Sequence, residues 1–274
     1  MLITIHDLTH ILDARYRDTL KSHMYARPIL RLGARKATHI FTVSEYSKRQ
    51  IVEHLDVPAE KVTVTYNGVA PKFFPEPREQ AMQTVHRECG VTRPYVLYVG
   101  NLKPHKNVDG LLRAFALMWN RTAGNCELLI IGDDTSDGRD LKELVVKLGI
   151  GTAIKFAGKV SDEVLRSAYS SAELTVLPSF EEGFGLPILE SMACGTPVAC
   201  SRAASLPEVG GSAAEYFDPH DIESITATIE RLLHSDGDRD RLRQSGFLNV
   251  RRFTWSACAN RHLEIYRQHC PLRS

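Results

Sequence analysis

The chain alternates between short apolar runs and longer amphipathic stretches. Five apolar, β-rich runs and one short element predict strands, at 95–99, 126–131, 154–157, 173–177, 197–200 and 214–217. Between them, apolar positions recur every three or four residues and predict helices, near 107–119, 141–148, 162–171, 187–194, 221–234 and 238–251. Strands that alternate with helices in this order predict a doubly wound parallel sheet.

Residues 1–70 show the same alternation over a shorter length. Their apolar runs predict three strands, at 2–5, 39–43 and 61–66. A helical stretch to about Lys36, interrupted by Pro28, and a helix capped by Ser44 connect these strands. Three strands form a sheet that is marginal alone, so we expect residues 1–70 to be only part of an N-terminal domain.

The chain after this region is rich in proline, at Pro71, Pro75, Pro77 and Pro94. Such a composition is typical of a linker, so we place a linker at 71–93 and a second domain at 94–254. Thr254 is expected to cap a last helix. Its apolar residues share one stripe, at Trp255, Ala259, Leu263 and Tyr266. This stripe needs a surface to pack on, either in its own domain or in the first one.

The overall composition limits the class of function. The 274 residues are 43% apolar, which supports one large core or two modest ones, and the formal charge of +1 provides no extended field for nucleic acid. Six scattered cysteines without a C-x-x-C pair are typical of reduced thiols, so a cytoplasmic location is expected. Because no apolar run of about eighteen residues occurs, no membrane span is predicted.

Residues 178–197 carry the strongest chemical signal. They follow a predicted buried strand and are expected to form a loop and a short helix with Pro187 in its first turn. A helix N-terminus that follows Gly183 and Gly185 presents unpaired backbone N–H groups, which a bulky anion can approach closely. The pattern therefore predicts a phosphate site.

Two acidic residues flank this site, Glu182 before it and Glu190 one turn inside the helix. Two Glu separated by seven residues, with Gly-Phe-Gly and Pro between them, resemble the signature of the retaining, nucleotide-sugar-dependent GT-B glycosyltransferases. The resemblance implies that Glu182 meets hydroxyls of the donor sugar and that Glu190 holds the ribose. It also implies that the amides of Gly183, Phe184 and Gly185 hold the diphosphate.

The resemblance also implies an architecture. It is a GT-B-like α/β fold with a complete C-terminal Rossmann-like domain and a partial N-terminal Rossmann-like domain. The terminal helix, within 255–274, is then expected to pack back toward the N-terminal domain. Members of this family carry several β-α units before the Thr-Ile-His-Asp segment, here residues 4–7, so a truncated N-terminal domain is expected.

The loop after the strand at 95–99 supplies the candidate cation. Lys106 lies where a side chain can reach phosphates held by a helix end, although a solvated loop lysine is the alternative. The family has an arginine where this chain has Asn101, so one cation is missing, and Lys103 is the candidate substitute. By position, Gly132 and the loop with Gly158 and Val160 are expected to line the donor pocket.

His6 matches the family histidine that faces the donor sugar across the cleft between the domains. Its expected role is to position the sugar, with Asp7 fixing its tautomer; alternatively, both residues are only the polar end of a strand. Glu208 resembles a family position near the donor pocket, but a Glu at a helix start is usually a complement to the helix dipole.

Two charged stretches allow a functional and a plain explanation. Arg27, Arg31 and Arg35, together with Lys21 and Lys36, form either a face for an anionic membrane or a solvated surface. The acidic run 236–240 lies between two predicted helices, where caps explain it better than a metal site does, so no metal is expected.

The resemblance thus implies a retaining hexosyltransferase of polysaccharide or glycolipid biosynthesis. The expected donor is a nucleoside diphosphate sugar, GDP-mannose favoured over a UDP-sugar, and the expected acceptor is a saccharide or lipid-linked hydroxyl. No cofactor and no nucleic-acid partner are expected. A fragment that binds the nucleotide sugar without turnover is the alternative. A glycoside hydrolase is disfavoured, since Glu190 lies behind the phosphate site and cannot flank one bond together with Glu182.

Overall fold

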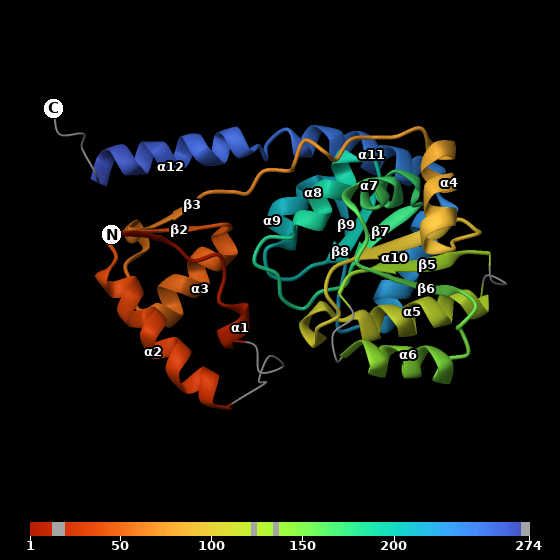
Figure 1. Cartoon of the computed structure of the whole chain (residues 1–274), viewed down its shortest axis with the longest axis horizontal. Coiled ribbons are helices and arrows are strands. Elements are labelled where there is room, and N and C mark those ends of the chain that lie inside the picture. The colour runs from red at the N-terminus through yellow and green to blue at the C-terminus, as the bar shows by residue number, and fades with distance from the viewer. Residues whose placement is uncertain (13–19, 122–124, 134–136, 270–274) are drawn as a thin grey trace.

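The computed structural model describes residues 1–12, 20–121, 125–133 and 137–269. Across these residues the chain forms two parallel sheets, a small one of three strands and a large one of six, each with its own helices (Figure 1). The predicted α/β class with parallel sheets is therefore confirmed. We call residues 1–64, around the small sheet, the N-terminal unit, and residues 78–250, around the large sheet, the C-terminal unit.

The N-terminal unit is a β-α-β-α-β arrangement with strand order β1-β2-β3. Its elements are β1 (Leu2–Thr4), α1 (Thr9–Leu12), α2 (Leu20–Lys36), β2 (His39–Thr42), α3 (Glu45–Leu55) and β3 (Val62–Val64). Ile40, Ile51 and Leu55, from β2 and α3, are fully buried in its core. Ser44 caps α3 as predicted, since its Oγ accepts a hydrogen bond from the Ser47 amide at 3.0 Å.

Helix α2 does not stop at Pro28, where the sequence predicted an interruption; it runs through this residue. A proline removes one hydrogen bond of the helix, and the carbonyl that loses its partner must find another. Pro28 is exposed, and α2 continues through it despite the lost hydrogen bond.

The C-terminal unit contains the large sheet, with strand order β6-β5-β4-β7-β8-β9 and all pairs parallel. Its strands are β4 (Tyr95–Val99), β5 (Glu127–Ile131), β6 (Ile154–Gly158), β7 (Leu174–Leu177), β8 (Val198–Ser201) and β9 (Ala214–Phe217). Its helices are α4 (Arg78–Cys89), α5 (Val108–Arg121), α6 (Asp137–Lys147), α7 (Asp162–Ser171), α8 (Leu186–Ala193), α9 (Leu206–Gly210), α10 (Ile222–His234) and α11 (Asp236–Val250).

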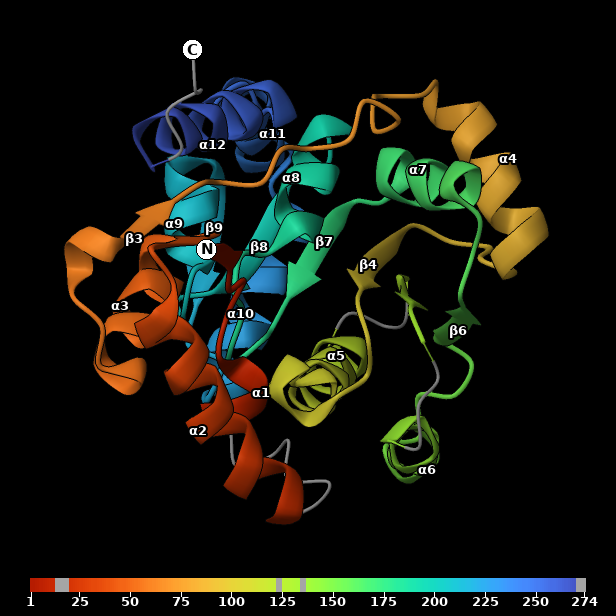
Figure 2. The ribbon, with the colours of Figure 1, turned by 60° about the vertical axis from the view of Figure 1, so that its left-hand side comes forward.

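Helices cover both faces of the large sheet, which explains why its strands are apolar throughout. Along β4, Val96 and Tyr98 pack into the cluster with α5 and α10, whereas Tyr95 and Leu97 pack into the cluster with α4 and α7. Figure 2 shows α5 and α7 on opposite sides of the sheet. The carboxyl ends of the strands remain as the edge where loops and ligands can meet.

The proline-rich segment 71–93 contains a helix. Helix α4 packs against α7, and its residues Ala81 and Val85 are fully buried. The backbone from β3 runs along the top edge of the molecule in Figure 1, from the N-terminal unit to α4 at the far side of the C-terminal unit. This segment therefore connects the units through a packed element.

The last helix, α12 (Trp255–His269), lies across the small sheet (Figure 1). The rings of His262 and Tyr266 lie 4.2 and 5.5 Å from the ring of Phe41 on β2. Of the predicted apolar stripe only Tyr266 takes part in this contact, because Trp255 and Leu263 are about half exposed while Ile265, outside the stripe, is 4% exposed. Both faces of α12 are partly apolar, and packing on β2 selects the one with His262 and Ile265.

Candidate active site

The order of the large sheet reverses between β4 and β7. From β4 the chain moves outward to β5 and β6, and β7 then pairs on the other side of β4. Loops that follow two such neighbouring strands lead away from each other, and the crevice between them is where ligands bind in sheets of this kind. The loop after β4 carries Asn101 and Lys106, and the loop after β7 carries Glu182 and Gly183.

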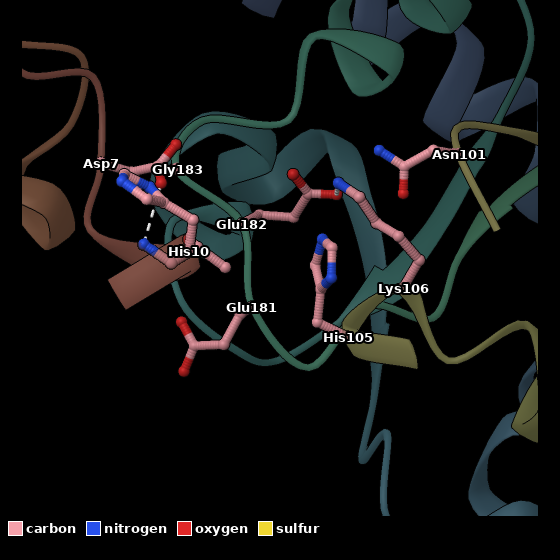
Figure 3. A pocket seen from close by; sticks show the side chains of 9 residues that line it. Asp7, His10, Asn101, His105, Lys106, Glu181, Glu182 and Gly183 are labelled. Carbon is pink, nitrogen blue, oxygen red and sulfur yellow. Dashed lines mark hydrogen bonds and ion pairs between the residues drawn. The ribbon is translucent and has the colours of Figure 1, made fainter. Parts of the chain in front are cut away.

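A pocket of about 270 Å³ lies at this crevice. Its lining comes from both units: Asp7, Thr9 and His10 from the N-terminal unit, and Asn101, His105, Lys106, Glu181, Glu182 and Gly183 from the C-terminal unit (Figure 3). The pocket therefore depends on how the two units are packed against each other.

Lys106 and Glu182 form an ion pair in this pocket, and Figure 3 shows their side chains pointing toward each other. Lys106 Nζ lies 2.6 Å from Glu182 Oε1, and the two side chains are only 16% and 12% exposed. Ser179 Oγ donates a second hydrogen bond to the same carboxylate oxygen at 3.0 Å. Lys106 is thus not a solvated loop lysine, and the sequence did not reveal its pairing with Glu182.

A short 3₁₀ turn, Pro104–Lys106, places Lys106. Asn107 ends this turn with a φ of 56°, and its side-chain amide donates to the carbonyls of Pro178 and Pro219 at 3.1 and 2.9 Å. The loop after β4 is therefore tied to the loop after β7. This fixed backbone holds the cation beside Glu182.

Asn101 occupies the place where the resemblance implies an arginine, and it lines the pocket. Its Oδ1 accepts a hydrogen bond from the Lys103 amide at 3.3 Å, which forms a local turn. The Lys103 side chain is partly buried but does not line the pocket. The predicted substitution of the arginine by Lys103 stays a prediction.

The Gly-Phe-Gly segment opens helix α8, with Gly185 as its N-cap at a φ of 98°. Ile188 N donates to Gly185 O at 3.0 Å, and this is the start of the helical hydrogen bonding. Pro187 has no N–H, so the amides of residues 184–186 precede the helix ladder, and their predicted role in binding a phosphate stays a prediction.

Gly183 and Phe184 have structural tasks that the sequence did not predict. A Cβ on Gly183 would lie 2.5 Å from Asp7 Oδ2, so the space beside this glycine is filled by the N-terminal unit and not left open for an anion. The Phe184 ring is 5% exposed and packs near Tyr66 and Phe253, with ring centroids at 6.3 and 5.9 Å. Only the backbone of Phe184 can therefore meet a ligand.

Glu190 lies one turn inside α8 and does not line the pocket. It accepts a hydrogen bond from Tyr169 Oη at 2.9 Å. Burial raises the pKa of the Glu190 carboxyl, and the Tyr169 hydrogen bond and the charge of Lys72 partly oppose this shift. Glu182 and Glu190 lie on either side of the start of α8, and the predicted role of Glu190 in holding the ribose stays a prediction.

The other glycines predicted near the donor lie along the carboxyl edge of β5 and β6. Gly132 N donates to Gly158 O at 2.9 Å, and a Cβ on Gly132 would lie 1.7 Å from Gly100 O. The missing side chain of Gly132 permits this close approach to the loop after β4, but neither Gly132 nor Gly158 lines the pocket. Val160 follows this edge and packs against the cluster around Tyr95.

The segment after β1 contributes Asp7, Thr9 and His10 to the pocket, whereas His6 is exposed and does not line it. Asp7 Oδ1 accepts from the Thr9 amide at 2.9 Å, which starts α1 and places His10 toward the pocket. The role predicted for His6 stays a prediction. An aspartate two residues before the first amide of a helix was the available signal for this turn, and the sequence analysis missed it.

The charged stretches outside the pocket have local partners. Ser235 caps α11 by accepting from the Asp238 amide at 3.2 Å, so Asp236 and Asp238 lie in the first turn of this helix and not between two helices, where the sequence analysis placed them. In the part of the chain that the structure describes, no three His, Cys, Asp or Glu side chains group in a way that could hold a metal ion.

The basic stretch lies on α2. Arg31 and Arg35 both contact the Asp56 carboxylate, with Arg31 at 2.7 Å, and these arginines lower the pKa of Asp56. Arg27 is exposed, and the side chain of Lys21 lies outside the described residues. Among the helices that the structure describes, none combines the length and the apolar character needed to cross a bilayer.

The chain is similar in sequence to named mannosyltransferases. The chain is 32% identical over 266 residues to O-antigen chain mannosyltransferase B of Escherichia coli, a match that covers 96% of this chain and 69% of that protein. It is 33% identical over 238 residues to the MMP alpha-(1->4)-mannosyltransferase of Mycolicibacterium hassiacum, covering 85% of this chain and 54% of that one. The chain thus spans between about half and two thirds of the length of these two relatives.

Solved structures share the fold. A sucrose-phosphate synthase from Thermosynechococcus elongatus superposes with a TM-score of 0.83 at 24% identity, covering 97% of this chain and 67% of that chain. The Anabaena HepE protein in complex with UDP-glucose superposes with a TM-score of 0.84 at 18% identity, covering 97% and 72%. The predicted GT-B-like fold is confirmed by these glycosyltransferase neighbours.

Family models match nearly the whole length of the chain. The model for Glycosyltransferase Family 4 matches residues 1–73, and the model for Glycosyl transferases group 1 matches residues 86–248. The second match includes both pocket loops and helix α8. The chain therefore belongs to the glycosyl transferases group 1 family.

Proposed function

We propose that this protein transfers a hexose, with mannose favoured, from a nucleoside diphosphate sugar to an acceptor hydroxyl, with retention at the anomeric carbon. The observation that carries the proposal is the Lys106–Glu182 pair at 2.6 Å, held at the reversal of the sheet beside the first amides of α8. A cation and free amides suit a diphosphate, and an adjacent carboxylate suits sugar hydroxyls.

The chemistry needs charge stabilisation at the leaving group. When the bond between sugar and phosphate breaks, its electron pair stays with the diphosphate, while the acceptor oxygen bonds to the anomeric carbon and its hydroxyl proton passes to the departing diphosphate oxygen. Lys106 and the amides of residues 184–186 stabilise that added charge, and one preorganised donor is typically worth about 3 kcal/mol. Glu182, fixed by Lys106 and Ser179, orients the sugar.

The remaining residues have supporting roles in this proposal. Glu190 holds the ribose on the far side of the helix start, while Asn101 and the loops at Gly132 and Gly158 surround the rest of the nucleotide. The acceptor, a saccharide or a lipid-linked sugar, enters from the side of Asp7 and His10. We assign 1–70 to the acceptor side, 71–93 to a linker, 94–254 to the donor side, and 255–274 to a helix that returns to the acceptor side.

The proposed donor follows from the named relatives. Two similar proteins are named mannosyltransferases, which favours a mannosyl donor, with GDP-mannose ahead of UDP-sugars. The proposed membrane contact follows from helix α2. Ile29 and Leu32 are 66% and 59% exposed, and the exposed Lys36 shares their face at helical spacing, a face that can lean on an anionic membrane. Absence of binding to anionic vesicles at low salt would exclude this contact.

The test is a donor screen. The protein is incubated with labelled GDP-mannose and several UDP- and ADP-sugars, and transfer and donor hydrolysis are measured beside calorimetric binding of GDP and UDP. Turnover of one donor, lost in Glu182→Gln, supports the proposal. Binding of a nucleotide without transfer or hydrolysis favours the alternative of a non-catalytic nucleotide-sugar-binding protein, and no binding of any nucleotide or donor refutes both.

A further inference from the structure

Glu208, on the short helix α9 of the C-terminal unit, reaches across to the N-terminal unit. Its Oε1 accepts a hydrogen bond from the Glu45 amide at 2.7 Å, and its Oε2 accepts one from the Tyr46 amide at 3.2 Å. These two amides open α3, where the helix has unsatisfied N–H groups and a partial positive charge. The carboxylate therefore complements the dipole of a helix in the other unit, 162 and 163 residues away in sequence.

The same helix end is bound to the pocket loop. Ser44 Oγ, fully buried, donates to Gly183 O at 2.7 Å, and Ser47 Oγ lies 3.2 Å from the same carbonyl. Tyr46 Oη donates to Glu181 Oε2 at 2.6 Å. The first turn of α3 thus contacts two of the residues that line the pocket.

Helix α9 also holds the loop directly. Ser205, which precedes this helix, donates its hydroxyl hydrogen to Glu182 O at 2.8 Å. Burial raises the pKa of the nearby Tyr66, and an interaction with the Glu208 carboxylate raises it further. α9, the pocket loop and the first turn of α3 form one connected set of hydrogen bonds.

We propose that Glu208 is a positioning residue: by binding the Glu45 and Tyr46 amides, it keeps the first turn of α3 on the Gly183 carbonyl and so holds Asp7 and His10 opposite Lys106 and Glu182. This role rests on the proposed glycosyl transfer, for which both sides of the pocket must be in place. Glu208 does not line the pocket, so it acts through α3 and not on the substrate.

The proposal separates nucleotide binding from transfer. The groups that hold the nucleotide belong to the C-terminal unit, so Glu208→Ala should leave the Kd for GDP or UDP within about threefold of the wild-type value. Transfer needs the aligned N-terminal unit, so kcat/KM should fall by about tenfold or more, with kcat reduced. A residue that only supported its own helix would produce no such split.

A local readout tests the contact without any turnover. Hydrogen exchange of the amides in residues 44–50 and 181–186 is compared in wild type, Glu208→Ala and the shape-conserving Glu208→Gln. The matched control is Glu79→Ala, because Glu79 also lies in the first turn of its helix, α4, but is exposed and far from α3 in sequence. Faster exchange in both peptides of the Glu208 variants, and not in the control, supports the proposal.

Unchanged exchange in both peptides of Glu208→Gln overturns the proposal, whether or not the alanine variant folds. Transfer by Glu208→Ala at the wild-type rate also overturns it. If the wild-type protein shows no transfer or hydrolysis with any donor, the proposed function fails, while the exchange experiment still decides whether Glu208 holds α3 on the loop.

Discussion

Replacing Gly183 by alanine tests whether the two units meet at the pocket loop as the structure describes. The added Cβ would lie 2.5 Å from Asp7 Oδ2 and 2.8 Å from Asp7 Cβ, whereas ordinary van der Waals contact begins at 3.4 Å. Asp7 or the loop must therefore move by the difference, about 0.9 Å at the closest atom. The backbone of Gly183 is not in the left-handed region, so this steric contact, and not backbone strain, is the cause.

The size of the effect follows from this geometry. Overpacking at a fitted contact costs about 1–3 kcal/mol. Movement of the loop also stretches the hydrogen bond from Ser44 Oγ to Gly183 O, now 2.7 Å, and such a bond contributes about 1 kcal/mol. The two terms add to about 2–4 kcal/mol. At about 2–4 °C per kcal/mol for a chain of this size, the melting temperature should fall by roughly 4–16 °C.

The measurement is thermal and denaturant unfolding of Gly183→Ala, with donor transfer measured on the same samples. Gly151→Ala is the matched control, because Gly151 is exposed, has nothing within 4 Å of its added Cβ and needs no left-handed backbone. We expect transfer to fall in Gly183→Ala only. Equal melting temperatures for the two variants, within about 1 °C, would refute the close approach of Asp7.

Three further changes test separate parts of the site and of the unit contact. Lys106→Met removes the cation but keeps most of the side chain, so kcat for transfer should fall by about a hundredfold, and a value within about threefold of wild type contradicts its role. Burial raises the pKa of Glu190, so the native state holds the carboxyl proton more tightly than the unfolded state does. The stability of wild type relative to Glu190→Gln should therefore decrease as pH rises above 4.5. A constant stability difference in denaturant unfolding from about pH 4.5 to 8 argues against the raised pKa. The ring of His39 on β2 lies beside that of His269 on α12, and burial and this neighbour lower the pKa of His39. The contribution of neutral His39 to the free energy of unfolding should therefore be lost as pH falls below 6.5. In His39→Asn this loss should shrink when unfolding is measured from about pH 7.5 to 5.5, and equal pH profiles for both proteins count against it.

The local pattern of the sequence determined most of the elements. The run at 95–99 is strand β4 with the same bounds, and helix α7 at Asp162–Ser171 coincides with the predicted 162–171. Periodicity is a property of neighbouring residues, so it can be read without the fold. It failed where the surroundings decide: α2 continues through the exposed Pro28, and packing on Phe41 selects the contact face of α12.

The candidate site divides in the same way. The sequence singled out Lys106 and Glu182 separately, each on a loop after a predicted strand, because cations, acids and glycines at such places have a direct chemical meaning. It gave no sign that Asp7 fills the space beside Gly183 or that Glu208 binds the first turn of α3. Only the tertiary structure decided these contacts, because they depend on β4 and β7 being neighbours and on the packing of two units, which no local spacing encodes.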